Sequence, residues 1–157
     1  LDDELLSCVT SLTPNEQEAG AETHLPLRAD ENGIEREDLQ RIADSLRSRG
    51  VEHVIITLGG SGSAIVEPSG IRYASCVRMP QVADPTAAGD SFVAAFCIGI
   101  TAGLSQEEAI TFASYTAAIT VSRMGAMPSL PRMEEVQVLM REREHAGFGG
   151  CLPEALR

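Results

Sequence analysis

The sequence predicts an α/β fold with a mostly parallel sheet flanked by helices and an antiparallel hairpin at one edge. Residues 5–12, 34–46 and 51–58 follow each other as an apolar run, a helical pattern and a β-branched run. This strand, helix, strand order predicts neighbouring parallel strands. Two short β-like runs, 63–67 and 71–75, are separated by a few turn residues and predict the hairpin.

The first elements are read from apolar spacing. Leu5 to Leu12 is apolar-rich and stops at Thr13-Pro14-Asn15, which indicates a strand that runs into a turn. Apolar residues then recur at helical spacing until Gly50, a residue suited to ending a helix. They are Ile34, Leu39, Ile42 and Leu46. The segment "VEHVIITL", Val51 to Leu58, is typical of a strand buried on both faces.

The later elements begin with the hairpin, whose strands are joined by Pro68-Ser69-Gly70. A third β-like run, Val77 to Val82, precedes a helix predicted over Ser91 to Ala102 and closed by Gly103. Ser105 to Glu108 has the spacing of a capping box and starts the next helix. A last helix follows Pro131, and the tail from His145 onward is expected to be irregular.

Composition limits the function. The chain has 157 residues, which suits one domain or a piece of one, and its formal charge of -11 argues against nonspecific binding to nucleic acid. Its four cysteines are far apart and indicate neither a zinc site nor a disulfide framework, so we expect a reduced, cytoplasmic protein. The apolar stretch 92–104 is too short to span a membrane.

The first residues carry no targeting signal. The chain starts Leu1-Asp2-Asp3-Glu4, without an initiating Met and without a basic segment followed by an apolar one. We therefore expect a fragment whose upstream part is missing.

The segment "DPTAAGDSFVAAF", residues 84–96, carries the strongest chemical pattern. Ala87, Ala88 and Gly89 precede a predicted helix, and side chains this small let a phosphate approach the free N–H groups of the first turn. Asp90 lies at the end of this cradle, where its carboxylate could accept a proton from a hydroxyl that attacks the phosphate. The alternative is that Asp90 only complements the helix dipole.

Other polar clusters are less specific. The glycines of "TLGGSGS", residues 57–63, indicate either phosphate or ribose contact or a tight connection between strands, and match no Walker or dinucleotide motif. The cluster of Glu35, Glu37 and Asp38 is interpreted as the solvated face of a helix.

Four segments together resemble the ribokinase-like (PfkB) carbohydrate kinase family, and most closely its ribokinases. "DPTAAGDSF" resembles the D-T-x-[GA]-A-G-D signature, and "LTPNEQEA", 12–19, the N-x-x-E segment. "VIITLGGSG", 54–62, resembles the nucleotide-contacting strand and loop, and "AAITVSRMGAMPSLPRMEEV", 117–136, the C-terminal segment. The four matches occur in the order of the family and span most of the chain.

The resemblance implies the C-terminal half of a three-layer α/β/α kinase. Residues 1–144 would form its nucleotide-binding and catalytic part and 145–157 a tail, while the sugar-binding half and the lid would be absent. The implied activity is transfer of the γ-phosphoryl group of ATP to a hydroxyl of a small sugar, with Mg²⁺. The full-length protein would be a homodimer that pairs through its lid, and the isolated fragment is expected to be inactive.

The resemblance also assigns roles to residues. Asp90 would be the catalytic base, and the amides of Ala87, Ala88, Gly89 and Asp90 would form the anion hole. The remaining positions would contact the nucleotide or the water shell of Mg²⁺; they are Asn15, Glu18, Thr57, Gly59, Gly62, Gly89 and Ser114. Ser114 stands where ribokinases often have Asn.

A monovalent cation site, expected to hold K⁺, is implied beside the anion hole. Its oxygen ligands would come from Asp84, from the Ser129 hydroxyl and from four backbone carbonyls. The carbonyls belong to Thr86, Thr120, Arg123 and Gly125. Pro85 stands where the family usually has Thr.

Two other functions remain open. One is a nucleotide-binding or regulatory module derived from such a kinase, against which Asp90 and the Asn15-x-x-Glu18 pair argue, because binding alone requires no base. The other is a kinase of the same family with a nucleoside or a sugar phosphate as acceptor.

Overall fold

The structure is a computed structural model that describes residues 1–30 and 33–143. The predicted tail, 145–157, lies outside these residues. The contacts divide the chain into two compact units, Leu1–Cys76 and a second one that begins at Val77. No helix in the described ranges is long and apolar enough to span a membrane.

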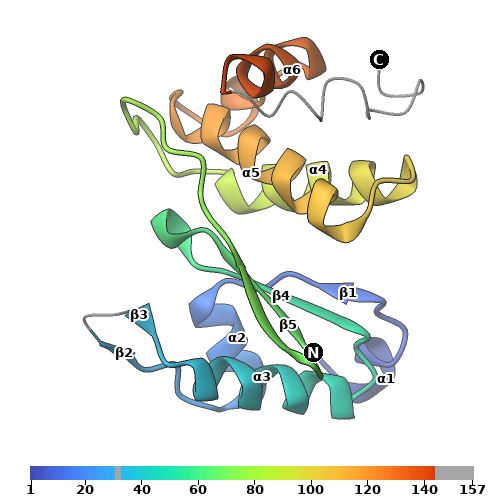
Figure 1. Cartoon of the computed structure of the whole chain (residues 1–157). Coiled ribbons are helices and arrows are strands. Elements are labelled where there is room, and N and C mark those ends of the chain that lie inside the picture. The colour runs from blue at the N-terminus through green and yellow to red at the C-terminus, as the bar shows by residue number, and fades with distance from the viewer. Residues whose placement is uncertain (31–32, 144–157) are drawn as a thin grey trace. The chain divides into compact units, whose positions relative to one another are not determined.

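The first unit is an α/β layer (Figure 1). Its helices are α1 (Asp3–Leu6), α2 (Glu16–Thr23), α3 (Arg36–Ser48) and a 3₁₀ turn, Gly59–Ser61. Its strands are β1 (Ser11–Leu12), β2 (Ala29–Asp30), β3 (Gly33–Ile34), β4 (His53–Thr57), β5 (Ser63–Glu67) and β6 (Gly70–Ala74).

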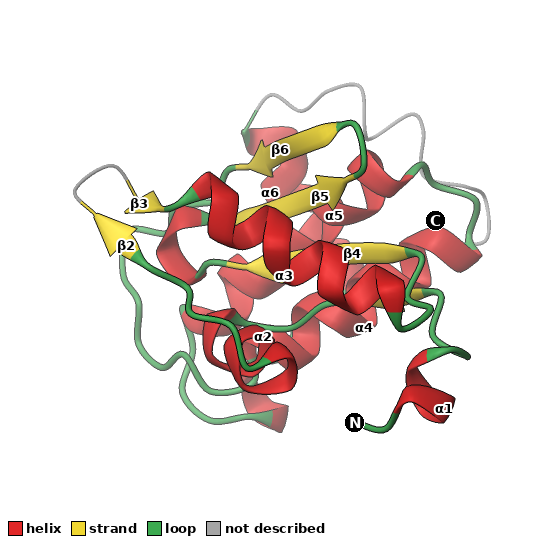
Figure 2. Ribbon diagram, turned by 90° about the horizontal axis from the view of Figure 1, so that it is seen from below, coloured by secondary structure: helices red, strands yellow, loops and turns green. Residues whose placement is uncertain are grey.

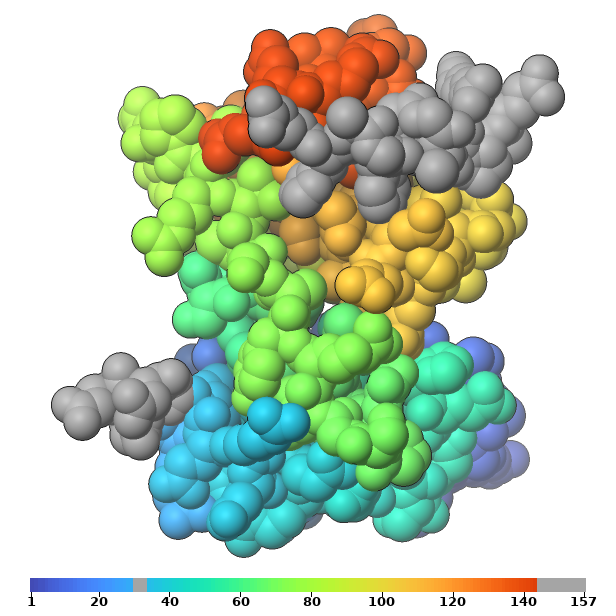
Figure 3. All heavy atoms as spheres, viewed as in Figure 1, coloured from blue at the N-terminus to red at the C-terminus, as the bar shows by residue number. Residues whose placement is uncertain are grey.

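The main sheet has the order β1-β4-β5-β6. β1 pairs with β4 in parallel, whereas β4–β5 and β5–β6 are antiparallel. The α/β class and the hairpin at the edge are therefore confirmed, and the sheet of the described residues is mixed. Figure 3 shows the segment around β6, in green, on the surface of the first unit. β5 is mostly buried, whereas Tyr73 of the edge strand β6 is exposed.

The core of this unit lies between α3 and the sheet (Figure 2). The predicted helix and the predicted strand 51–58 are both confirmed as α3 and β4. Leu39, Ile42 and Leu46 repeat at helical spacing and are fully buried against alternate residues of the strands. Val54, Ile55 and Ile56 are buried in succession, as expected of a strand covered on both faces.

The interpretation of Asp38 as part of a solvated face is wrong. Its side chain is fully buried in the first turn of α3 and accepts hydrogen bonds from the backbone N–H, Nε and Nη2 of Arg28, each at 2.9 Å. Arg41 forms a further ion pair with it. The Arg28 side chain, its backbone N–H and Arg41 together lower the pKa of the Asp38 carboxyl. The buried charge thus attaches the segment before β2 to α3.

Two strand predictions are wrong. In the predicted strand Leu5 to Leu12, only Ser11–Leu12 is strand and residues up to Leu6 are helical, because Asp2 caps α1 by accepting from Leu5 N–H at 2.8 Å. The predicted β-like run Val77 to Val82 forms neither strand nor helix. Individual contacts link this run to other parts of the second unit, such as the hydrogen bond from Arg143 Nη2 to the Arg78 carbonyl at 3.0 Å.

The second unit is helical in its described part. It contains α4 (Ala88–Thr101), α5 (Gln106–Val121), a 3₁₀ turn (Met127–Ser129) and α6 (Met133–Glu142). These confirm the three predicted helices and the capping box of Ser105 and Glu108. α4 and α5 pack closely (Figure 1). A Cβ built on Gly99 would lie only 3.0 Å from the Ala109 Cβ, so the two helices meet at a position without a side chain.

Candidate functional site

The turn before α4 is tied to the loop after α5. Asp84 Oδ1 accepts from Thr86 N–H and Oδ2 accepts from Gly125 N–H, both at 2.9 Å. The Val121 carbonyl accepts from the N–H groups of Ala83 and Asp84 at 2.7 and 3.2 Å. The Thr86 side chain and the N–H groups of Thr86 and Gly125 lower the pKa of the Asp84 carboxyl. A single carboxylate therefore joins two segments that are both predicted to line the cation site.

The start of α4 forms an open cradle of backbone donors. Ala87, the N-cap, has φ 62° and ψ 10°, a left-handed conformation that costs a non-glycine residue about 1 kcal/mol or more. Ala88 N–H donates to the Pro85 carbonyl at 3.2 Å, whereas among the described residues no acceptor binds the N–H groups of Ala87, Gly89 or Asp90. No atom lies within 4 Å of a Cβ built on Gly89. The helix N-terminus is thus accessible to an anion.

The Asp90 side chain is solvent-exposed in the first turn of α4. It forms no hydrogen bond or ion pair with the part of the chain that the structure describes. A carboxylate beside a cradle of N–H donors can complement the helix dipole or accept a proton from a bound hydroxyl. The geometry is compatible with both interpretations made from the sequence.

The other predicted cation ligands surround the end of α5. Thr120 and Ser129 are fully buried, and their hydroxyls donate to the carbonyls of Thr116 and Ala126 at 3.0 and 2.6 Å. The Thr120 carbonyl accepts from Arg123 N–H at 3.1 Å. In the described ranges, no hydrogen bond reaches the carbonyls of Thr86, Arg123 and Gly125. Those three oxygens remain available to a cation, whereas the Thr120 carbonyl also serves the turn.

Ser114, the predicted adenine neighbour, is half-buried on α5. Its hydroxyl donates to the Ile110 carbonyl at 2.8 Å, one turn earlier in the same helix. Its present hydrogen bond is therefore local to the helix.

In the first unit, Asn15 and Glu18 bind each other. Asn15 Oδ1 accepts from Glu18 N–H, and Glu18 Oε2 accepts from Asn15 N–H, both at 2.9 Å. This capping box starts α2 and was not recognised in the sequence, although N-x-x-E has the spacing for it. An isolated β-bridge pairs Asn15 with Thr57, so the box lies beside the end of β4.

The glycine loop 57–63 connects β4 to β5. It closes with a hydrogen bond from Leu58 N–H to the Gly62 carbonyl at 2.8 Å, and Gly59 and Gly62 have φ 51° and 98°. A Cβ on Gly62 would lie 2.0 Å from the Ala74 carbonyl oxygen, whereas one on Gly59 or Gly60 would have no atom within 4 Å. Gly62 is thus required by the connection itself, and the loop beside Gly59 is open enough for a ligand.

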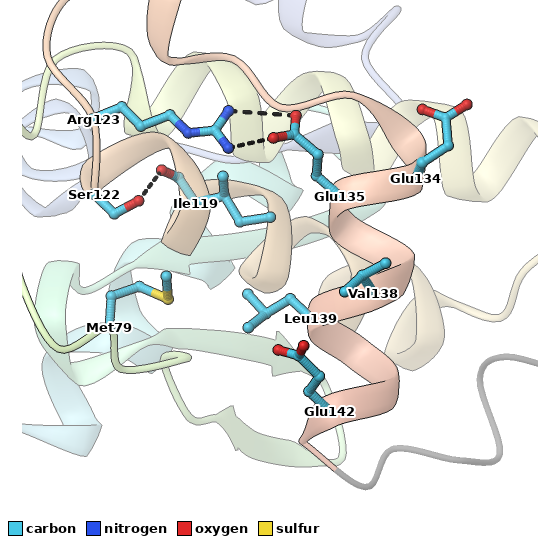
Figure 4. A pocket seen from close by; sticks show the side chains of 9 residues that line it. All are labelled: Met79, Ile119, Ser122, Arg123, Glu134, Glu135, Val138, Leu139 and Glu142. Carbon is cyan, nitrogen blue, oxygen red and sulfur yellow. Dashed lines mark hydrogen bonds and ion pairs between the residues drawn. The ribbon is translucent and has the colours of Figure 1, made fainter.

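A separate hollow of about 410 Å³ lies between the end of α5, α6 and the segment around Met79 (Figure 4). Ile119, Val138 and Leu139 form its apolar lining, and Arg123 makes an ion pair with Glu135 at 2.5 Å across its edge. Of the residues predicted for the site, only Arg123 lines it. Sequence patterns gave no signal for this hollow, because its lining comes from three separate segments.

Comparisons with known proteins agree with the resemblance. A model of the "pfkB family carbohydrate kinase" matches residues 2–133. The ribokinase of Arabidopsis thaliana is 33% identical over 139 residues, which are 88% of this chain and 35% of the relative. The 1-phosphofructokinase of Haemophilus influenzae is 32% identical over 134 residues, 82% of this chain and 41% of the relative.

The fold agrees as well. The structure of the Arabidopsis thaliana ribokinase complexed with ribose and ATP has a TM-score of 0.81 at 33% identity and covers 89% of this chain and 43% of that one. The chain spans well under half the length of these relatives, 35% and 41% of the two curated proteins.

Proposed function

The chain belongs to the pfkB family of carbohydrate kinases, and from this premise we propose that it carries the ATP site, the anion hole and the catalytic base of an ATP-dependent sugar kinase. The observation that carries the proposal is the start of α4, where unpartnered backbone N–H groups lie next to the exposed carboxylate of Asp90. The solved ribokinase with ribose and ATP, which is similar over most of this chain, supports a sugar and ATP as substrates.

In the proposed reaction, Asp90 takes the proton from the sugar hydroxyl. The hydroxyl oxygen then forms a bond to the γ-phosphorus of ATP while the bond to the β-γ bridging oxygen breaks, and ADP leaves. The N–H groups of Ala87, Gly89 and Asp90 stabilise the negative charge on the transferred phosphoryl group. The left-handed turn at Ala87 fixes the direction of these donors before any ligand binds.

Mg²⁺ and K⁺ fit this site to different extents. For Mg²⁺ held through water and phosphate, the carboxylate of Glu18 is an oxygen donor present in the first unit. Oxygen donors suited to K⁺ are present in Asp84 and the carbonyls of Thr86, Arg123 and Gly125. When bound, Mg²⁺ would neutralise phosphate charge, and K⁺ would add positive potential beside the N–H donors.

The role of Asp90 is tested by Asp90→Asn in the intact polypeptide that carries these residues. Loss of the base should lower kcat by about 10²- to 10⁴-fold and leave the Kd for ATP within a few-fold. The matched control is Glu52→Gln, which neutralises an exposed carboxylate without a predicted role. If Asp90→Asn retained activity, the assignment of the base would be wrong. Equal loss of ATP binding would contradict the role of Asp90 as the base.

The role of Glu18 can be separated from its cap. Glu18→Gln keeps an oxygen that accepts from Asn15 N–H, so α2 and the melting temperature should be preserved. Removal of the charge should raise the Mg²⁺ concentration needed for half-maximal rate. An unchanged Mg²⁺ dependence would restrict Glu18 to capping.

The cation site is tested with rates in K⁺ and Na⁺ at equal ionic strength, where we expect the K⁺ rate to be higher. Identical rates would remove the site from the proposal.

The similarity to a 1-phosphofructokinase also favours a second candidate, a kinase whose acceptor is a sugar phosphate. A comparison of kcat/KM for sugars and sugar phosphates distinguishes the two.

A further inference from the structure

The Ser63 hydroxyl is buried without a partner. Ser63 is only 1% exposed, and its Oγ accepts or donates no hydrogen bond among the described residues. Hydroxyls in folded proteins are nearly always satisfied when buried, because leaving one unpaired costs about 1–3 kcal/mol. An unpaired hydroxyl at the end of a strand therefore requires an explanation.

The strand register places Ser63 directly beside Thr57. The two residues face each other across β4 and β5. The next pair toward the loop, Leu58 and Gly62, is joined by the hydrogen bond from Leu58 N–H to the Gly62 carbonyl. They therefore form a non-hydrogen-bonded pair, in which the Cβ atoms are about 4.5–5.5 Å apart and the side chains share one face. Since successive residues alternate, this face is opposite to the one on which Ala64 and Val66 join the core against α3.

The surroundings of this pair are suited to an anion held by neutral donors. Thr57 lies next to Asn15, and the backbone at Gly59 and Gly60 is open. Residues 57–63 contain no Lys or Arg in a chain whose formal charge is -11. Hydroxyl and amide N–H groups are thus the donors that this loop can offer to a phosphate.

We propose that Ser63 is a further nucleotide-binding residue, whose hydroxyl donates to a phosphate oxygen of the nucleotide beside Thr57. This inference rests on the proposed function, because it uses the nucleotide of that reaction. It adds Ser63, the last residue of the loop 57–63, for which the family resemblance implied no role.

Binding is tested with the intact polypeptide and the variants Ser63→Ala and Ser63→Cys. The control is Ser69→Ala, which removes an exposed hydroxyl from the hairpin turn. Kd values are measured by calorimetry, or by saturation-transfer NMR at millimolar ligand, for a non-hydrolysable ATP analogue, inorganic tripolyphosphate and adenosine. We expect about tenfold weaker binding of the analogue and of tripolyphosphate to both Ser63 variants, with adenosine unchanged.

Three results would overturn the inference in distinguishable ways. Unchanged affinity for the analogue in Ser63→Ala would remove Ser63 and leave the proposed kinase intact. Weaker adenosine binding with unchanged tripolyphosphate binding would place the contact on the nucleoside and contradict a phosphate contact. Failure of the wild-type polypeptide to bind any of these ligands would overturn the proposed function together with the inference.

A second measurement is independent of ligands. If Ser63 Oγ has no partner in the ligand-free protein, Ser63→Ala should melt at or above the wild-type temperature. A melting temperature several degrees lower would mean that the hydroxyl already has a structural partner, such as a buried water, and would overturn the inference.

Discussion

Gly62 and Gly60 belong to one loop but meet different surroundings. A Cβ on Gly62 would lie 2.0 Å from the Ala74 carbonyl oxygen and 2.7 Å from the Cys76 nitrogen, both of them backbone atoms, at φ 98°. Gly60 has open space around it and no positive φ. The need for glycine is therefore steric at one position and absent at the other.

We expect Gly62→Ala to lower the free energy of unfolding by about 3 kcal/mol or more, because backbone must move to admit the methyl group. Gly60→Ala should change it by less than about 0.5 kcal/mol. Urea unfolding of both variants measures the difference. Similar stabilities would contradict the close approach at Gly62.

Asp38 makes stability depend on pH. Its pKa is lowered from the ordinary value of 3.8 by Arg28, so the folded state favours the charged carboxylate. Its contribution is complete above the unfolded pKa and is lost as the pH falls below that value through the folded pKa.

Asp38→Asn should therefore lower the melting temperature by several degrees at neutral pH, because Arg28 and Arg41 lose their charged partner. The difference from wild type should stay constant between about pH 7 and pH 4 and shrink as the pH falls further. Melting curves across this range, with Asp44→Asn as an exposed-carboxylate control, test the effect. A constant difference at all pH values would mean that the charge of Asp38 is not the cause.

For single residues, sequence patterns identify those whose role depends on their immediate sequence neighbours. The small side chains of 87–89 predicted an accessible helix start from their own identity, and the structure has one there. The burial of Asp38 and of Ser63 was missed because it depends on contacts that their own sequence patterns do not show. Arg28 is ten residues from Asp38, and the Thr57–Ser63 pair follows from strand register.

Among the elements, α2 and α5 both begin with a reciprocal capping box. In α5, Ser105 Oγ accepts from Glu108 N–H at 3.3 Å and Glu108 Oε2 accepts from Ser105 N–H at 2.8 Å. Both acidic residues of α5, Glu107 and Glu108, lie in its first turn, and the cap at Ser105 sets where the helix begins. That start in turn aligns Gly99 of α4 with Ala109.

Ser105→Ala should lower the free energy of unfolding by about 1 kcal/mol, because the first turn of α5 loses a side-chain acceptor. Ser105→Asp, which retains one, should remain within about 0.5 kcal/mol of wild type. Chemical denaturation compares the two. Equal losses would indicate that the cap does not determine the effect.

The elements themselves were predicted well where periodicity extended over several turns. α3, α5 and α6 were found because their apolar residues repeat at helical spacing, and α4 from the run 91–102 that ends at Gly103. The run 5–12 was misassigned because five apolar residues are too few to separate a helical turn from a strand, and the cap at Asp2 decides between them. The run 77–82 contains β-type residues but has no described strand beside it.

For the whole molecule, the division between Cys76 and Val77 coincides with a connecting segment without regular structure. Arg78 is exposed in it, whereas Arg47 lies within α3 and Arg72 within β6. Proteases require an extended, accessible backbone, so we expect this segment to be cleaved more readily than the helices and strands on either side of it.

Limited trypsin digestion should therefore cut after Arg78 before it cuts after Arg47, Arg49 or Arg72. The expected products are residues 1–78 and a fragment that begins at Met79, identified by mass spectrometry. Arg78→Gln should slow their appearance strongly. Earlier cleavage after Arg47 or Arg49 would contradict the assignment of α3 as a stable element.

The contact between Asp84 and Gly125 has a consequence for the order of folding. It joins positions 41 residues apart, and closing a loop of that length costs roughly 3 kcal/mol of chain entropy. Helices α4 and α5 shorten the effective loop once they have formed. The entropy cost of closing it is then smaller, so the contact stabilises the chain most after both helices are present. The turn that precedes α4 should then acquire amide protection late in refolding, and the cradle of N–H donors would be assembled by helix packing rather than by its own short sequence.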